Sequence, residues 1–254
     1  MIFNKLKMNR LIALMCLLLF NGKTFSQIDS LNKPVKNQAF FVSAGVSMPI
    51  STGFASRADG YAKNGFTTIT TYSNQFYKML EFSISHVFMV NKLNTNDLAN
   101  NLKTTIESQV NNKLNYTSAK SSDWINNALV GGIGIRKALN QNGKLVAFAN
   151  VQAGIAYVFS PSTETFIQID QLFYSTKVKR TKNFAPAFGG NIGINYIFTP
   201  KTGIIFNTNF SNINLNGNNL EVTEIGNNSY VSKTYYFEQK ITSLNFSLGI
   251  STHF

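Results

Sequence analysis

Residues that could do chemistry are few in this chain, because only 13% of its residues are charged. Glu81 and Arg136 are the exceptions, since both fall on the polar face of a stretch of alternating polar and apolar residues. If this polar face is turned toward the inside of the protein, each charge on it needs a partner, because the desolvation of a buried charge costs several kcal/mol. We therefore expect these two side chains to pair, either as a structural salt bridge or as part of a proton or ion pathway.

Catalytic and metal-binding motifs are missing from the sequence. The two histidines, His86 and His253, have no nucleophile or carboxylate cluster near them in the sequence, and no GxSxG, HExxH or CxxC motif occurs. We predict no catalytic residues, no metal site and no cofactor. An enzyme remains an alternative.

The composition suits a protein whose outer surface does not face water. Hydrophobic residues make up 44% of the chain, with 22 Phe and 10 Tyr, whereas Asn, Ser and Thr take the place of charged residues. An average soluble domain has about 25% charged residues. The formal net charge of +12 includes four basic residues before position 27, which leaves +8 beyond it. No basic-aromatic motif for nucleic acid is present, so no nucleic-acid partner is predicted.

The first residues predict an export signal. Lys5, Lys7 and Arg10 precede the apolar run 11–20, which is too short for a membrane-spanning helix of about 20 residues. Small residues at Thr24 and Ser26 favour cleavage before position 27. We predict a signal peptide at 1–26, a short periplasmic segment at 27–37 and one domain at 38–254.

Eight stretches after the signal alternate with the two-residue period of a strand that has two different faces. They lie at about 38–48, 65–73, 77–90, 124–138, 145–159, 185–198, 203–213 and 237–254. Short connections, near 73–75 and at 139–144 and 199–203, alternate strictly with long ones at 49–64, 91–123, 160–184 and 214–236. In an up-and-down sheet this pattern places every short turn at one end and every long loop at the other.

The polar face decides which side of the sheet points inward. It carries Gly, Ser, Asn and Ala rather than the Lys and Glu that would meet water, whereas the apolar face carries aromatic residues towards the strand ends. Strands of this length also match the ~9–11 residues needed to cross a bilayer. We therefore predict an all-β, eight-stranded antiparallel transmembrane barrel with an apolar outer face. The predicted polar network in its lumen comprises Glu81, Arg136, Asn150, Gln152, Asn191 and Asn195.

The export signal, the alternating strands and the ending LNFSLGISTHF resemble the small outer-membrane β-barrel proteins of Gram-negative bacteria. The segment from MPISTGFAS to GYAKNGF (48–66) is similar to a first-loop pattern of the same group, with the glycine displaced to Gly53. The resemblance implies a location in the outer membrane, with short turns in the periplasm and long loops outside. It also implies that the barrel-assembly machinery reads the last strand through Phe246, Leu248, Ile250 and above all Phe254.

Two long connections hold further candidates. Leu98, Leu102, Ile106, Val110 and Leu114 recur every four residues, which predicts a helix over 95–114 with Asn96 or Asp97 as its N-cap. We expect it to rest on the barrel mouth, as packing or as a lid. In the third long connection, Lys177, Lys179, Arg180 and Lys182 form a basic cluster, either as a solvated charge run or as a contact for lipopolysaccharide phosphates.

The expected role is non-enzymatic: a structural or surface-interaction protein that acts through its long loops. A channel for ions or small solutes is the first alternative, although the lumen of eight strands is usually filled by side chains. A soluble periplasmic barrel is a further alternative. The expected partners are outer-membrane lipid, lipopolysaccharide and the assembly machinery, together with an unknown extracellular ligand.

Overall fold

The computed structural model describes residues 37–50, 52–55, 60–110, 114–226 and 229–254. The predicted signal peptide, its cleavage site and almost all of the 27–37 segment lie outside these residues. Among the described helices, none is both long and apolar enough to cross a membrane.

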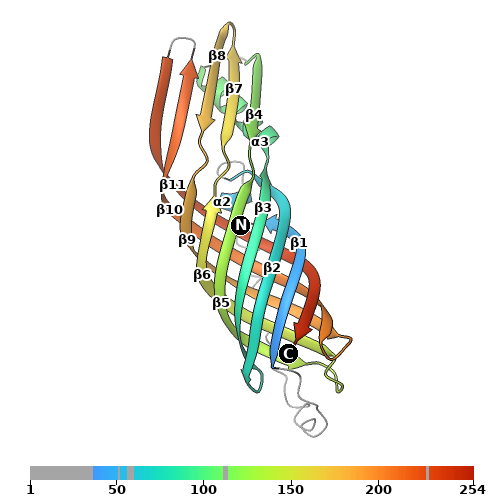
Figure 1. Ribbon diagram of the computed structural model, residues 1–254. Coiled ribbons are helices and arrows are strands. Elements are labelled where there is room, and N and C mark those ends of the chain that lie inside the picture. The colour runs from blue at the N-terminus through green and yellow to red at the C-terminus, as the bar shows by residue number, and fades with distance from the viewer. Residues whose placement is uncertain (1–36, 51, 56–59, 111–113, 227–228) are drawn as a thin grey trace, which may run out of the picture.

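Eight strands form a closed antiparallel barrel, as predicted (Figure 1). Each strand pairs with its neighbours in chain order, and β11 closes the ring by pairing with both β10 and β1. The barrel strands are β1 (Gln38–Pro49), β2 (Ala62–Tyr77), β3 (Leu80–Leu93), β5 (Trp124–Ala138), β6 (Leu145–Phe159), β9 (Lys182–Ile197), β10 (Thr202–Gly226) and β11 (Ser229–His253).

One predicted turn was misplaced. β2 does not end near Ser73 but continues to Tyr77, and the turn to β3 lies at Lys78 and Met79. The polar residues that suggested the turn keep the strand alternation: Ser73 points into the lumen and is 1% exposed. Lys78 takes the left-handed conformation that the tight turn requires, with φ 41°.

The long connections contain more structure than predicted. β4 (Tyr116–Ser121), β7 (Thr163–Ile169) and β8 (Leu172–Val178) pair with one another, and β8 pairs with the end of β10. β10 and β11 themselves continue as a ladder far beyond the barrel. The result is an open, five-stranded sheet that rises above the barrel mouth (Figure 1). We call it the upper sheet: β4, β7, β8, and residues 218–226 of β10 with 229–237 of β11.

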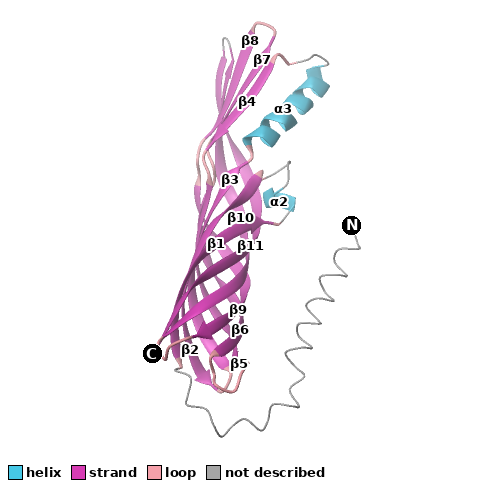
Figure 2. Ribbon diagram, turned by 90° about the vertical axis from the view of Figure 1, so that its right-hand side faces the viewer, coloured by secondary structure: helices cyan, strands magenta, loops and turns pink. Residues whose placement is uncertain are grey.

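Two helices lie at this end of the barrel. α3 (Thr95–Val110) runs along one side of the upper sheet and packs on β4 (Figure 2). Its first turn is capped by Asn94, whose Oδ1 accepts a hydrogen bond from the backbone N–H of Asp97 at 3.4 Å, so the predicted caps Asn96 and Asp97 were wrong. The helix packs beside the sheet rather than lying across the mouth, and Leu114 lies beyond its end. The short α2 (Thr52–Ala55) sits at the mouth.

Side chains fill the lumen in three layers. Phe41 and Phe148 stack near the short-turn end, with ring centroids 5.8 Å apart. Small polar residues occupy the middle. The upper lumen is apolar: Phe54 of α2 packs edge-on against Trp124 at 5.6 Å, within a cluster that includes Met89, Ile69, Ile213 and Ile241.

Candidate functional site

The pair expected between Glu81 and Arg136 lies in the lower lumen. Arg136 Nε stands 3.3 Å from Glu81 Oε2, and both side chains are at most 3% exposed. Arg136 Nη2 also donates to Ser73 Oγ at 3.0 Å, and the guanidinium lies 5.5 Å from the Phe41 ring centroid. The side chains of Ser73 and Asn150 reach the carboxylate as well. These contacts hold the two charges in one buried arrangement.

The other four residues of the predicted lumen network divide between two places. Gln152 lies in the middle layer, where it donates to Ser85 Oγ at 3.1 Å and accepts from Asn209 at 3.4 Å. Asn150 and Asn191 face each other in the β6–β9 register at the lower edge of the same layer, where Asn150 lies next to Glu81. Asn195 lies near the short-turn end, where its amide meets His253 Nε2 at 2.9 Å and its Oδ1 accepts from Ser251 at 2.9 Å.

Sequence reasoning missed several members of these networks. Asn207, Asn209 and Asn245 join the middle layer from β10 and β11, with Asn245 donating to Asn209 at 3.1 Å and Ser247 donating to Asn207 at 2.8 Å. Their inward position was readable from the strand alternation. Their pairing was not, because it depends on the register across the ring.

Inward-facing glycines show how tightly the lumen is filled. A Cβ at Gly193 would lie 2.3 Å from the Phe148 ring, and one at Gly132 would lie 2.9 Å from both Gln152 Cγ and Ser83 Oγ. Such distances leave no room for a side chain. The positions must stay small because larger residues on neighbouring strands occupy the space in front of them.

A metal site needs several His, Cys, Asp or Glu side chains close together. In the described part of the chain, no group of three or more such side chains could hold a metal ion. His86 points outward on β3, and His253 lies among Asn195, Ser251 and the edge of Phe41.

The basic cluster is partly engaged in local contacts. Arg180 donates to the backbone oxygens of Ser160 and Asp123 at 3.2 and 2.9 Å. Lys179 pairs with Glu221 at 3.2 Å on the surface. Lys182 stands 5.8 Å from the Phe159 ring centroid, and Lys177 is an exposed residue of β8. Arg180 and Lys179 therefore have polar partners in the structure, whereas Lys177 and Lys182 are exposed.

The last strand has the orientation expected of it. Phe246, Leu248, Ile250 and Phe254 point outward, with exposed fractions between 36% and 65%. Phe254 closes the ring, since its backbone N–H donates to Gln38 O at 3.1 Å and its ring stacks on Tyr72 at 6.4 Å.

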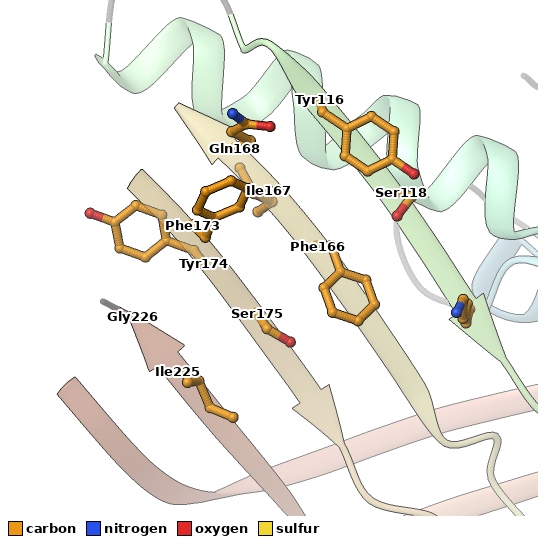
Figure 3. Close-up of a pocket in the computed structure, with 11 residues that line it drawn as sticks. Tyr116, Ser118, Phe166, Ile167, Gln168, Phe173, Tyr174, Ser175, Ile225 and Gly226 are labelled. Carbon is orange, nitrogen blue, oxygen red and sulfur yellow. The ribbon is translucent and has the colours of Figure 1, made fainter. Parts of the chain in front are cut away.

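The upper sheet carries a groove on the side away from α3 (Figure 3). Its volume is about 520 Å³. Aromatic rings and small polar groups line it together: Tyr116, Ser118 and Lys120 from β4, Phe166 and Gln168 from β7, Phe173 and Ser175 from β8, and Ile225 from β10. Ile167, which is buried, also lines the groove, together with Tyr174 and Gly226.

Comparison with known proteins gives matches among solved structures alone. No family model matches the sequence, and no curated protein matches it. Neisserial surface protein A is 10% identical, with 86% of this chain and 97% of that one covered and a TM-score of 0.40. The major outer membrane protein of Thermus thermophilus is 10% identical, with coverage of 85% and 99% and a TM-score of 0.45. The outer membrane protease OmpT of Escherichia coli is 9% identical, with coverage of 89% and 100% and a TM-score of 0.32.

Proposed function

We propose that this protein is an integral outer-membrane β-barrel without catalytic activity, which acts through the surface that its upper sheet presents outside the cell. The observation that carries the proposal is the inversion of polarity across the barrel wall. Large apolar side chains cover the outside, for example Val151 at 73% exposure, Ile250 at 65% and Ile133 at 61%. The middle of the lumen is instead built from Ser, Asn and Gln.

A barrel dissolved in water would show the reverse arrangement, because apolar surface is removed from water on folding. The closed ring also leaves no unpaired strand edge within the barrel, which hydrocarbon demands. Aromatic side chains mark both ends of the apolar belt. Tyr72 and Phe254 stack at the short-turn end, and Tyr157 packs against both Phe159 and Phe184 at the other, with centroids 4.7 Å apart in each pair.

A role in conduction is disfavoured by the lumen itself. An ion would have to pass the apolar layer around Phe54 and Trp124, the amide layer, and then the stacked Phe41 and Phe148 beside a salt bridge. A role in catalysis finds no support in the described side chains, which leaves the upper sheet and α3 as the surface for interaction.

The proposed location in the outer membrane implies two partners. The barrel-assembly machinery would read the outward row of the last strand during biogenesis, with Phe254 at the ring closure. Lipopolysaccharide phosphates would meet Lys177 and Lys182 just above the aromatic residues at the upper end of the belt, because both side chains are exposed there.

Cysteine labelling on intact cells tests the proposal. The chain has one cysteine, Cys16, inside the predicted signal, so single cysteines can be introduced without interference. Y230C lies on the upper sheet, V151C in the middle of the apolar belt and N142C in a short turn. A membrane-impermeant maleimide is expected to label Y230C on intact cells, N142C only after the cells are broken, and V151C in neither case.

Other outcomes would point to another arrangement. Rapid labelling of V151C would show that water surrounds the belt, as in a soluble periplasmic barrel. Labelling of N142C but not Y230C on intact cells would invert the orientation. Fractionation provides the matched measurement, since the protein should remain with the outer membrane and migrate differently on a gel before and after heating.

A further inference from the structure

The outer face of the barrel continues without interruption onto the upper sheet. In β11 the even-numbered residues, such as Phe246 and Leu248, face outward from the barrel, and no bulge on this strand changes the alternation above it. Tyr230 therefore lies on the outer face, and it pairs with Ile225, which pairs in turn with Ser175. The groove consequently opens sideways, on the same side as the apolar belt.

The register arranges this face into three rows that cross the strands. The lowest row is Lys120, Glu164 and Lys177, a cation, an anion and a cation side by side. Above it lie Ser118, Phe166, Ser175, Ile225 and Tyr230, and the uppermost row is Tyr116, Gln168 and Phe173. Charges therefore lie nearest the membrane belt, and aromatic and polar groups lie above them.

The two upper rows have the chemistry that recognises a saccharide. Tyr116 and Phe173 are 57% and 61% exposed and present flat apolar surfaces. Ser118, Ser175 and Gln168 add hydroxyl and amide groups that donate and accept hydrogen bonds. Sugar rings pack their C–H faces on aromatic rings while their hydroxyls exchange such bonds. The groove volume of about 520 Å³ lies within the range of small-molecule binding sites.

Basic side chains lie between the apolar belt and the upper rows of the groove, in a position suited to binding a phosphate. Lys182 and Arg180 stand over Phe159 at the upper end of the belt, and Lys177 lies in the lowest of the three rows, at the level of Lys120. From Lys177 to Phe173 the strand rises by roughly 13 Å at about 3.3 Å per residue. A molecule lying along this face would thus meet lipid-like surface, then positive charge, then aromatic and polar groups.

We propose that the groove binds the saccharide of a phosphorylated glycolipid that stands beside the barrel in the same membrane leaflet. The acyl chains lie on the apolar belt, the phosphates meet Lys177 and Lys182, and the sugar core lies against Tyr116, Phe166 and Phe173. The inference rests on the proposed location in the outer membrane. Continuity with the lipid-facing belt argues for this occupant, because a groove that opens sideways above the bilayer is adjacent to lipid headgroups.

Binding of three probes to the full protein in detergent micelles tests the inference. The probes are lipopolysaccharide with a complete core saccharide, lipid A without that core, and the free core oligosaccharide. Y116A and F173A remove exposed rings from the groove, and Y235A removes an aromatic ring of similar exposure, 43%, from the opposite face. Calorimetric titration gives the affinity of each protein variant for each probe.

We expect Y116A and F173A each to weaken binding of the complete lipopolysaccharide about tenfold, and Y235A to leave it unchanged. Neither groove variant should alter binding of lipid A, because their rings lie above its phosphates. The inference would be overturned if Y116A and Y235A lost the same affinity for lipopolysaccharide. It would also be overturned if the groove variants lost as much affinity for lipid A as for lipopolysaccharide. If the free core oligosaccharide bound as tightly as the complete lipopolysaccharide, the lipid would contribute nothing to binding, and the assignment to a glycolipid would be wrong.

Failure of this inference and failure of the proposed function are distinguishable. If cysteine labelling places the barrel in the outer membrane and the groove variants bind lipopolysaccharide like the unsubstituted protein, only the saccharide assignment is wrong. If V151C is labelled in water, the belt does not face lipid and the proposed function fails first.

Discussion

Removing one member of the Glu81–Arg136 pair should destabilise the barrel far more than removing both. Arg136→Met keeps much of the side-chain length but leaves the Glu81 carboxylate buried without its cation. Glu81→Gln does the converse. The double variant replaces the ion pair with neutral groups of similar size, so that no charge is left inside the lumen.

The expected magnitude follows from the geometry. At 3.3 Å two unit charges attract by about 5 kcal/mol at an effective dielectric constant of about 20, and desolvation of the two groups offsets much of this gain. Breaking a buried pair on one side costs about 3–5 kcal/mol, whereas replacing both partners is often nearly neutral. We therefore expect each single variant to lose about 3–5 kcal/mol of unfolding free energy and the double variant to stay within about 1 kcal/mol of the unsubstituted protein.

Denaturant unfolding in detergent micelles measures these values. Trp124 is the one tryptophan of the chain and lies in the apolar layer of the lumen, so its fluorescence reports on the folded barrel. The surface pair of Lys179 and Glu221 supplies the control, because its side chains are 74% and 47% exposed. Lys179→Gln should cost no more than about 1 kcal/mol.

The reasoning would be refuted by a double variant as unstable as either single variant, since the loss would then come from packing or from the hydrogen bond to Ser73 rather than from an unpaired charge. Single variants that cost less than about 1 kcal/mol would also refute it. That result would mean that water reaches the pair, so the lower lumen would not be dry.

Three further predictions concern closure, packing and conduction. Deletion of Phe254 should lower the amount of folded protein in the outer membrane, measured by heat-modifiable migration, whereas Phe206→Ala on the same outer face should not; equal levels would show that the terminal ring is no assembly signal. Gly193→Val should destabilise the barrel by about 1–3 kcal/mol because its Cβ would meet the Phe148 ring at 2.3 Å, and Phe148→Ala should restore part of the loss. Gly131→Ala, whose Cβ would meet no atom within 4 Å, should be nearly neutral in the same unfolding assay. The protein in planar bilayers should show no stepwise conductance, and defined current steps would contradict a filled lumen.

The barrel was predictable because the two faces of each strand lie in different surroundings. The outer face is apolar and the inner face is lined largely by small polar side chains, so the sequence alternates over the full length of the strand. The salt bridge was predictable for a related reason: charges are rare on the inner face, and the few that occur must find each other.

The upper sheet was not predictable from the same pattern. In β7 and β8 apolar residues stand on both faces, as in the neighbours Phe166 and Ile167 of β7 and Phe173 and Tyr174 of β8. A strand with two apolar faces loses its alternation and resembles a loop. The plug formed by Phe54 was hidden for a different reason, since it depends on how the first connection folds back into the mouth.

The bulge at the rim of the barrel determines which residues the groove presents. Between Leu215 and Asn218, β10 contains one more residue than its partner β11. Below this point the odd-numbered residues of β10 face the lumen, as Ile213 does, and above it they face outward, as Ile225 does. Because a bulge reverses the alternation of one strand and increases the local twist, it lets the ladder leave the closed ring while Ile225 joins the outer face of β8 and β11. Ile225 therefore contributes to the groove because of this irregularity, which links the register of the barrel strand β10 to the composition of the groove above it.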